Sequence, residues 1–401
     1  MTSIVTLPVI EHREWAPRRA FLGVMLSFLV HGLVVSTWIS RIASVKSTLR
    51  LSDGAFGLTL LGTAIGSVTA IPVCGRLVTR YGSRRAAQWT GVGFCLALVA
   101  PALAWNGASL FGALLIFGAL AGANDVAMNA QAVATEKLRG RPAMSRFHAL
   151  FSLGGIVGAG AGALLAGRHV RPLAHLEGAA LVCLALALWG PRLMAETRPE
   201  TRMITPVRRV PPALVALSII GFCIFLSEGA IADWTGIYLK QVIGASAGLI
   251  PLGYAVFSAA MAIFRLAGDA ITVRIGRAST IRFGGLVAAA GIALAVGSHS
   301  VGWAFAGFGA AGAGFSSIIP LVFGAGGRVE SVGEGAGVAT VSGIGYLGFL
   351  AGPPAIGFIS EMINLRAGLF LLVLLSLTAV LLVSVVERSS AGSSNPLYDI
   401  C

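Results

Sequence analysis

Gly75-Arg-Leu-Val-Thr-Arg-Tyr-Gly-Ser-Arg-Arg85 joins two long apolar segments, and a related stretch, Gly268-Asp-Ala-Ile-Thr-Val-Arg-Ile-Gly-Arg277, follows about half a chain later. An apolar segment that carries a tryptophan precedes each stretch: Trp38 lies 44 residues before Gly82, and Trp234 lies 42 residues before Gly276. The chain therefore contains one structural unit twice. Such duplication is typical of two-lobed membrane transporters whose site lies between the lobes.

The composition indicates that most of the chain is surrounded by lipid. Hydrophobic residues make up 56% and charged residues 11% of the 401 residues, and the mean hydropathy is +0.86. Apolar runs of about the 20 residues that a bilayer crossing requires recur along the whole chain. Twelve spans are predicted, at residues 20–43, 55–74, 87–106, 108–133, 146–167, 174–193, 212–240, 248–269, 281–298, 302–324, 335–358 and 365–387.

We predict an all-α membrane protein whose twelve transmembrane helices form two pseudo-symmetric six-helix bundles. A polar segment between Ala195 and Val210, rich in arginine and glutamate, separates the first six spans from the last six. The first apolar run has the length of a span and no small-residue cleavage site, so we expect a retained helix rather than a signal peptide. The expected divisions are a cytoplasmic N-terminal segment (1–19), an N-terminal bundle (20–193), a cytoplasmic linker (194–211), a C-terminal bundle (212–387) and a cytoplasmic tail (388–401).

The net charge of +13 is better explained by membrane topology than by nucleic-acid binding. With both termini in the cytoplasm, 22 of the 29 lysine and arginine residues lie on the cytoplasmic side and seven lie outside. This imbalance is what the positive-inside rule predicts. The seven outside residues are Arg41, Lys46, Arg50, Arg168, Arg171, Lys240 and Arg366.

No residue pattern in the chain indicates catalysis or cofactor binding. The spacing of the five cysteines suggests neither a metal site nor a disulfide framework. No nucleophile arrangement or phosphate-binding loop accompanies them. We therefore expect a protein that is not an enzyme, that holds no metal or other cofactor and that works as a monomer. The cysteines are Cys74, Cys95, Cys183 and Cys223, in or at the ends of predicted spans, and Cys401.

The hairpin from Gly75 to Arg85 resembles the Gly-x-Leu-x-Asp-Arg-x-Gly-Arg-Lys signature between helices 2 and 3 of the major facilitator superfamily. Within that superfamily, several runs look like the fucose-permease-related bacterial permeases, and most of all like inner-membrane permeases of the YbjJ type. The resemblance implies an inner-membrane permease that moves a small polar solute, sugar-like or a related metabolite, by alternating access with proton coupling. The runs are Trp38 with Arg41, Gly122–Asn129, Phe147–Gly155, Glu228–Trp234 and Gly345–Pro354.

The repeated hairpin is expected to contribute to cytoplasmic gates. Glycine permits a tight turn, and arginines at the cytoplasmic face can pair with helix ends or with acids of the neighbouring bundle. Thr79 replaces the Asp of the signature in the first copy, whereas the second copy keeps an acid, Asp269. The alternative is that the arginines only determine topology. Candidate gating residues are Gly75, Arg76, Arg80, Gly82 and Arg84 in the first copy and Asp269, Arg274 and Gly276 in the second.

Two carboxylates, Asp125 in span 4 and Glu228 in span 7, lie deepest in the predicted membrane segments. A charged group at the bilayer centre costs about 2.5–3.5 kcal/mol on an insertion scale, so intramembrane acids usually have a function. Spans 1, 4, 7 and 10 line the central cavity in the superfamily, and the resemblance therefore implies that both acids face it. Asn129 shares a helical face with Asp125. We expect both acids to contact solute and one of them to carry the coupling proton; alternatively, Asp125 is a structural acid capped by a neighbouring helix.

Other candidates for solute contact are aromatic or titratable. Trp38 and Trp234 occupy matching positions near the outer ends of spans 1 and 7, where they either line the cavity or belong to an interfacial aromatic belt. His31 lies on the same helical face as Trp38 and is expected at the cavity. Asp233 is expected to form an outer gate pair with Arg41 in preference to a solute contact. The predicted solute-binding set is Trp38, Asp125, Asn129, Glu228, Trp234 and His31.

Two other functions stay open at this point. A proton-driven exporter of a drug or metabolite uses the same fold, although span 5 lacks the Gly-Pro motif of the drug:proton antiporter branch. A non-transporting receptor or scaffold is the third alternative, but the chain has no sizeable hydrophilic segment that would relay a signal. The expected partners are a small-molecule solute, protons and the lipid bilayer.

Overall fold

A computed structural model describes residues 16–141, 143–196, 211–329 and 334–391. These residues form thirteen α-helices and one short 3-10 helix, and no strand occurs among them. Most of the predicted linker and of the predicted terminal segments lies outside the described residues. The helices are α1 (Ala16–Thr48), α2 (Asp53–Tyr81), α3 (Ser83–Ala97), η1 (Ala100–Leu103), α4 (Gly107–Arg139), α5 (Met144–Gly167), α6 (Pro172–Leu193), α7 (Pro212–Gln241), α8 (Leu252–Ile275), α9 (Arg277–Gly297), α10 (Val301–Phe315), α11 (Ile318–Gly326), α12 (Glu334–Met362) and α13 (Leu365–Ala391).

Twelve helical segments are long and apolar enough to cross a membrane, which confirms the predicted twelve-helix, all-α fold. Several helices extend beyond the predicted apolar spans. α2 ends at Tyr81 rather than at residue 74, and α13 ends at Ala391 rather than at residue 387. Hydropathy marks the hydrocarbon region, whereas the helical hydrogen-bond pattern continues through arginine-rich turns because arginine has a high helix propensity.

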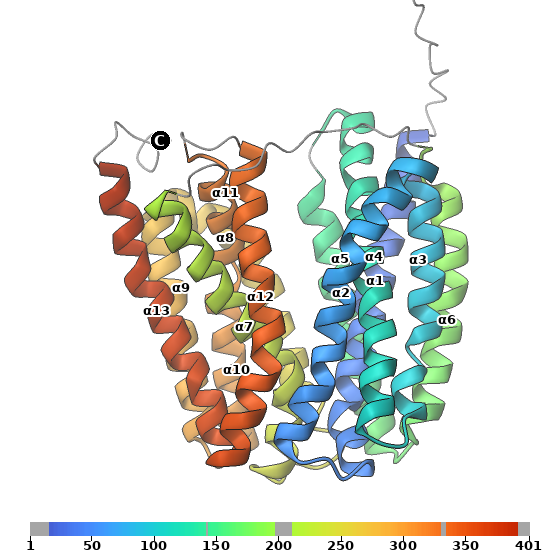
Figure 1. The fold of residues 1–401 in the computed structure, drawn as a ribbon, viewed down its shortest axis with the longest axis vertical. Helices are drawn as coiled ribbons and strands as arrows, with labels where there is room; N and C mark the ends of the chain where they lie inside the picture. Colours follow the sequence, from blue (N-terminus) through green and yellow to red (C-terminus); the bar gives the residue numbers. More distant parts are fainter. Residues whose placement is uncertain (1–15, 142, 197–210, 330–333, 392–401) are drawn as a thin grey trace, which may run out of the picture.

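The helices form two bundles, α1 to α6 at the N-terminal side and α7 to α13 at the C-terminal side (Figure 1). Successive crossings alternate in direction, so α6 ends and α7 begins at the same end of the molecule, which we call the linker end. The opposite end, where α1 passes into α2, is the far end. The two bundles lie close together at the far end and diverge toward the linker end (Figure 1).

The tenth crossing is broken into α10 and α11 at the point where the sequence has two serines and a proline. Pro320 has no N–H, so it cannot donate to the carbonyl of Ser316 four residues earlier. The Ser316 carbonyl is thereby free to accept a hydrogen bond from outside its own helix. A break of this kind is tolerated at membrane depth only where protein or water satisfies the freed backbone group.

The turns of the two duplicated hairpins have the same backbone conformation. Gly82, between α2 and α3, has φ 83° and ψ 152°, and Gly276, between α8 and α9, has φ 82° and ψ 158°. The Gly82 N–H donates to the Val78 carbonyl at 3.0 Å, and the Gly276 N–H donates to the Thr272 carbonyl at 2.9 Å. Only glycine occupies this backbone region readily. The sequence repeat is therefore also a repeat of backbone structure.

Replacement of Gly82 by alanine is expected to destabilise the folded protein, because a Cβ is strained at this φ. The expected loss in the free energy of unfolding is about 1–3 kcal/mol, observed as a lower melting temperature of the detergent-purified protein. Gly75→Ala is the matched control, because Gly75 lies inside α2 and an added Cβ would meet no atom within 4 Å. Equal melting temperatures for the two variants would contradict this explanation of the turn.

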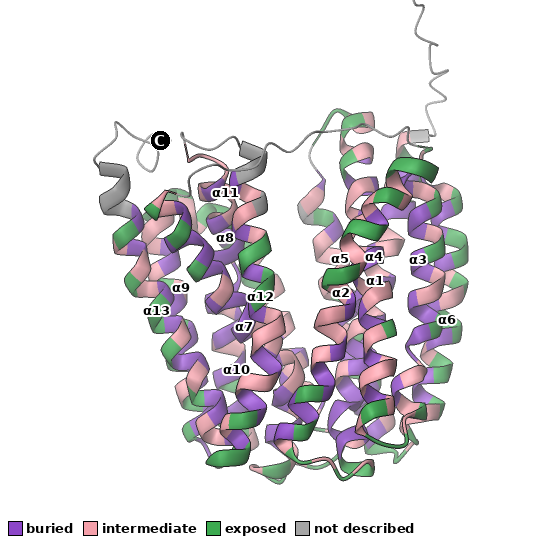
Figure 2. Ribbon diagram, in the orientation of Figure 1, coloured by how far each residue is buried: buried purple, intermediate pink, exposed green. Residues whose placement is uncertain are grey.

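Buried residues lie inside the bundles and exposed residues lie on their outer surface (Figure 2). Many of the exposed side chains are large and apolar. Large side chains such as Leu181 and Leu381 are 70% and 72% exposed, as expected for residues that face lipid. Trp105 and Trp303 are also exposed, and both lie at the far end just before or within the first turn of a helix. Tryptophan favours the membrane–water interface, so these two residues mark the edge of the hydrocarbon region.

Close packing within a bundle depends on small residues. Gly154, Gly158 and Gly162 recur every fourth residue on α5, and a Cβ at any of them would run into the backbone or a serine of α1. This spacing places all three on one face of the helix. It allows the two helices to approach as closely as small-residue motifs permit in membranes.

Candidate functional site

A cavity of about 680 Å³ lies between the two bundles, in the half of the molecule nearer the linker end. Its lining comes from α5 of the N-terminal bundle and from α7, α8, α11 and the break before α11 in the C-terminal bundle. Most of the lining is apolar. The polar residues of the lining are His148, Ser152, Glu228, Arg265, Asp269, Thr272, Ser316 and Ser317.

The cavity extends from the linker end toward the middle of the molecule. On α5 its lining runs from Met144, at the start of the helix, to Ile156. On α8 the lining runs from Thr272, near the end of the helix, back to Ala259. Each stretch covers about 18–20 Å at the helical rise per residue. This depth is enough to bring a molecule from the linker end to the centre of the membrane.

Arg265 lies on α8 beside the broken crossing. Its Nε–H donates to the Ser316 carbonyl at 3.0 Å, the same carbonyl that Pro320 leaves without a partner in its own helix. Gly268, almost one turn further along α8, makes room for Ser317, because a Cβ at Gly268 would collide with the Ser317 hydroxyl. These contacts hold α8 against the break and fix one edge of the Arg265 guanidinium in the cavity wall.

Glu228, the acid predicted in span 7, lines the same cavity from α7. Its Oε1 is buried and has no hydrogen-bond partner among the described residues. Arg265 interacts electrostatically with Glu228, but no ion pair joins these two residues. A buried acceptor without a donor is unfavourable. Glu228 Oε1 can therefore accept a hydrogen bond from water or from a molecule bound in the cavity.

Asp125 and Asn129 lie together on α4, but neither lines this cavity. The Asn129 amide donates to Asp125 Oδ1 at 3.1 Å and to the Asp125 carbonyl at 2.9 Å. Tyr346 on α12 interacts electrostatically with Asp125. Asp125 and Asn129 therefore share one face of α4, as expected. Asp125 and Glu228 do not line one cavity in this conformation.

An aromatic cluster connects the cavity wall to the surroundings of Asp125. Phe225 lines the cavity from α7 and stacks on Tyr346, with ring centroids 5.3 Å apart and 5° between the ring planes. Phe349 and Phe323 lie 4.9 Å and 6.0 Å from Phe225 by the same measure. Tyr346 is therefore in contact with a cavity residue on one side and in the field of the α4 acid on the other.

The rings of Trp38, Trp234 and His31 pack inside the protein rather than lining this cavity. Trp38 is 3% exposed and belongs to the hydrophobic core of the protein. The Asn124 amide donates to His31 Nδ1 at 2.9 Å. Trp234 meets Phe56 of the opposite bundle edge to face, with ring centroids 5.9 Å apart. In this conformation the three rings fill contacts between helices, and their expected contact with solute stays a prediction.

The expected gate pair between Arg41 and Asp233 is not formed in this structure. Arg41 is 2% exposed, and its Nε–H donates to His175 Nδ1 on α6 at 2.8 Å. Asp233 takes part in no ion pair among the described residues. Arg41 therefore belongs to the packing of its own bundle, because a neutral histidine nitrogen on α6 lies closer to it than the acid on α7.

The arginines of the first hairpin lie at the linker end. Arg76 and Arg80 are exposed. Arg84 donates to the Pro191 carbonyl of α6 at 3.0 Å and pairs with Glu196 at 3.3 Å. In this conformation Arg84 thus contacts the end of its own bundle, and the gating role expected for this hairpin stays a prediction.

The second hairpin begins at the cavity itself. Asp269 lies four residues after Arg265 on α8 and lines the cavity. Arg274, near the end of α8, is exposed and lies outside the lining. The acid that the second copy retains is therefore positioned at the cavity.

The family model described as Major Facilitator Superfamily matches residues 20–332, more than three quarters of the chain. The chain belongs to the major facilitator superfamily. An uncharacterised MFS-type transporter of Yersinia pestis is 37% identical over 354 residues, covering 88% of this chain and 92% of the relative. The uncharacterised transporter y4wD of Sinorhizobium fredii is 32% identical over 370 residues, covering 91% and 98% respectively. Membership of this superfamily makes the protein a transporter rather than an enzyme.

Solved structures of other superfamily members have the same fold. A bacterial homologue of the human lysosomal transporter Spinster, in an inward-facing and unoccupied conformation, matches with a TM-score of 0.74 at 14% identity, over 94% of this chain and 98% of that chain. The nucleoside transporter NupG matches with a TM-score of 0.70 at 15% identity, over 92% and 98%. At these identities the likeness shows the fold alone.

Arg265 is not among the site residues predicted from the sequence, because the count of charges on the two sides of the membrane placed it with the cytoplasmic arginines. A signal was available in the sequence. Arg265 lies inside the predicted span 248–269, and an ionisable residue within a span is a functional candidate by default.

A set of contacts that was not predicted from the sequence joins the two bundles of the transporter at the far end. The Asp53 carboxylate, at the start of α2, accepts a hydrogen bond from the Ser360 hydroxyl of α12 and pairs with Lys46 Nζ at 2.8 Å. The Gly54 N–H donates to Glu361 Oε2 at 2.9 Å. Glu361 therefore caps a helix N-terminus in the opposite bundle, where a carboxylate is favoured. We call these five residues the far-end latch.

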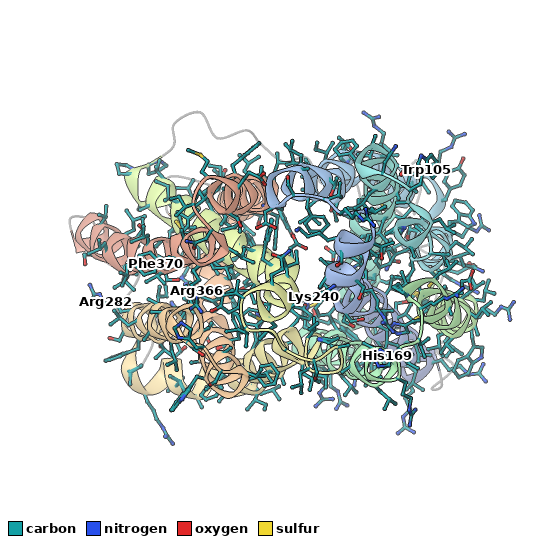
Figure 3. The ribbon with its side chains drawn as sticks, turned by 90° about the horizontal axis from the view of Figure 1, so that it is seen from below. Trp105, His169, Lys240, Arg282, Arg366 and Phe370 are labelled. Atoms are coloured by element: carbon teal, nitrogen blue, oxygen red, sulfur yellow. The ribbon has the colours of Figure 1, made fainter. Side chains whose placement is uncertain are left out.

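Lys240 weakens the far-end latch, because it repels Lys46. Figure 3, a view of the far end, shows Lys240 near the middle of the molecule and Trp105 at the edge of the N-terminal bundle. Lys240 and Lys46 interact electrostatically, and like charges repel each other. The closed far end is therefore a balance between latch contacts and lysine repulsion, and loss of one contact is expected to shift it.

Glu361→Ala is expected to open the far end. The substitution removes a charged acceptor, and hydrogen bonds to charged groups contribute about 1.5–3 kcal/mol, so the open population rises roughly tenfold or more. The reporter is Phe56→Cys in a background without native cysteines, because Phe56 is fully buried at the bundle contact. Maleimide labelling of this cysteine in detergent should accelerate to the same degree.

The control for this prediction is Glu177→Ala, which removes an exposed acid of α6 that takes part in no described ion pair. Its labelling rate should equal that of the parent reporter protein. An unchanged rate in Glu361→Ala would mean that the Gly54–Glu361 contact does not hold the far end closed.

Proposed function

We propose that this transporter moves a small polar solute, sugar-like or a related metabolite, across a bacterial inner membrane by alternating access coupled to protons. The observation that carries the proposal is the cavity of about 680 Å³ between the bundles. Small-molecule sites are clefts of about 300–1,000 Å³. The lining offers hydroxyl, carboxylate, guanidinium and imidazole groups, which suit a solute rich in hydrogen-bonding groups.

In this proposal the linker end and both termini face the cytoplasm. With Arg265 set aside as a cavity residue, 21 lysines and arginines fall on that side against seven on the other, in line with the positive-inside rule. The cavity reaches the linker end while the latch joins the bundles at the far end, and with this orientation both features support an inward-facing conformation. Rocking of the bundles, residues 20–193 and 212–387, then exposes the site to the other side.

Glu228 is proposed as the group that carries the coupling proton. It is an intramembrane acid at the cavity, and its Oε1 lacks a hydrogen-bond partner among the described residues. Ionisable residues in such positions commonly belong to proton relays. Asp125 is the second candidate, held by Asn129 and linked to the cavity wall through Tyr346 and Phe225.

Thermal stabilisation of the detergent-purified protein by sugars, polyols, amino sugars and common drugs tests the substrate class. We expect stabilisation by at least one polar metabolite. Ser152→Trp should abolish it, because the indole would fill the cavity from α5. Leu164→Trp is the matched control on the same helix, since Leu164 is 55% exposed on the outer surface, and it should leave the stabilisation intact.

Stabilisation by bulky lipophilic cations alone would contradict the proposal and favour an exporter of drugs. A polar solute that stabilises Ser152→Trp as well as the unmodified protein would contradict the location of the site. Solute flux then establishes direction, because an importer accumulates the solute inside vesicles oriented with the linker end inward.

A further inference from the structure

We infer that the transported solute carries a carboxylate group and that the Arg265 guanidinium binds it. This inference rests on the proposed function, because it concerns the same cavity. It adds a residue and a substrate class to that function: a small hydroxylated monoanion in place of a neutral polar solute.

The charge of Arg265 is not matched by an ion pair. Arginine within a membrane is rare and almost always pairs with an acid or with backbone carbonyls. Here the Nε–H donates to the Ser316 carbonyl at 3.0 Å, and Nη2 donates to Met261 Sδ at 3.2 Å. A neutral carbonyl and a thioether satisfy two N–H groups of Arg265, but neither carries a negative charge.

The third nitrogen of Arg265 is not fully buried. Nη1 makes no hydrogen bond to the described residues and is not among the buried polar atoms without a partner, so it is accessible to solvent. Arg265 lines the cavity itself. A guanidinium that is fixed at one edge and open at the other is prepared to receive an anion, because little conformational freedom is lost on binding.

Two acids lie close to Arg265, and neither forms an ion pair with it. Glu228 interacts electrostatically with Arg265 from α7 without forming an ion pair, and Asp269 lies four residues along α8, also unpaired. When Glu228 is ionised, its field offsets the charge of Arg265. When Glu228 binds the coupling proton, one of the two negative charges near Arg265 is removed, and an anion is repelled less from the guanidinium. Proton and anionic solute are therefore expected to bind together.

The number of charges favours a monoanion. Arg265 is the cation that lines the cavity, while Glu228 and Asp269 line it as acids. His148 faces Arg265 from α5, and Tyr254 of α8 interacts electrostatically with Glu228. With Glu228 protonated, Arg265 and Asp269 balance each other, so a monoanion adds one negative charge to the lining, whereas a dianion such as a phosphate monoester adds two. Hydroxyl groups of Ser152, Thr272, Ser316 and Ser317 suit the uncharged part of a hydroxy acid.

Matched pairs of compounds test the inference by thermal stabilisation of the detergent-purified full-length protein. The probes are glucuronate with glucose, galactonate with galactitol, and lactate with propane-1,2-diol, together with glucose 6-phosphate. We expect stabilisation by at least one carboxylate and a shift at least threefold smaller for its neutral partner. Arg265→Gln, which keeps a donor for Ser316, should remove the shift, and Arg265→Lys should retain part of it. Arg192→Gln, on an exposed arginine of α6 outside the cavity lining, should retain all of it.

A second readout separates binding from structure. One proton moving with one monoanion carries no net charge, so uptake into proteoliposomes should follow the pH gradient and be unaffected by an imposed membrane potential. A neutral solute carried with a proton would instead respond to the potential. Such a response would overturn the inference while leaving the proposed function intact.

Three further outcomes would overturn the inference: stabilisation by neutral partners as strong as by the acids, stabilisation by glucose 6-phosphate alone, or a full carboxylate response in Arg265→Gln. A different result would contradict the proposed function. A compound that stabilises the protein but shows no flux in either direction would contradict transport without bearing on the role of Arg265 in binding.

Discussion

Glu228→Gln is expected to abolish uphill accumulation of the solute, with ΔpH-driven uptake falling at least 100-fold, while exchange of solute down its gradient continues. Glutamine keeps the size and the hydrogen-bonding capacity of a protonated glutamate, so the cavity can still bind solute. It cannot release a proton, so the binding energy of the proton is no longer linked to transport. Uptake and counterflow assays in proteoliposomes measure the two activities side by side.

The control for this prediction is Glu177→Gln, which alters an exposed acid of α6 far from the cavity and should behave as the unmodified protein. Asp125→Asn discriminates between the two candidate proton carriers. Undiminished accumulation with an unchanged pH dependence in both Glu228→Gln and Asp125→Asn would refute the assignment of coupling to either acid.

Gly118→Leu is expected to prevent accumulation of folded protein. Gly118 lies on α4 where that helix contacts α2, and a Cβ at this position would overlap the carbonyl, carbonyl carbon and Cα of Thr63. Backbone atoms of a packed helix cannot move aside as a flexible side chain can, so the two helices must separate. The expected destabilisation is about 3 kcal/mol or more, observed as loss of the monodisperse peak in fluorescence-detected size-exclusion chromatography.

Gly112→Leu is the matched control for Gly118→Leu. Gly112 lies on the same helix, and an added Cβ would meet no atom within 4 Å. This variant should give a peak close to that of the unmodified protein. Comparable peaks for both variants would show that the close approach of α4 and α2 does not limit folding.

The fold was predictable because its signals are local. Apolar runs report the thickness of the hydrocarbon region, and the duplicated hairpin reports the repeat, down to the positive φ at Gly82 and Gly276. The break in the tenth crossing follows from Pro320, which cannot complete the helical hydrogen-bond pattern. The predicted helix ends were less accurate. α2 and α13 continue into polar residues, where the apolar runs of the sequence stop.

The site was only partly predictable, because residue depth can be read from a sequence but the direction of a side chain cannot. Glu228 lines the cavity, whereas Asp125, at similar depth, does not. Trp38 and Trp234 occupy matching positions in the repeat, yet one packs within its own bundle and the other meets Phe56 across the bundle contact. Small differences in helix rotation decide such outcomes, and periodicity does not encode them.

Arg265 and the far-end latch illustrate a second reason why the site was only partly predictable from the sequence. The carbonyl that Arg265 binds becomes available only because a proline in another helix leaves it free, and the acid that caps α2 lies more than 300 residues away at Glu361. Each contact requires two elements that fold side by side. A single sequence reveals the residue types but not which of them meet.

The most direct test of the account is uptake of the stabilising solute into proteoliposomes under an imposed pH gradient, with the far-end side made acidic. The unmodified protein is expected to accumulate the solute above its external concentration, whereas Glu228→Gln is expected only to equilibrate it. Equal accumulation in both proteins would contradict proton-coupled import through the cavity at Glu228. Net movement of the solute toward the acidic side would also contradict it.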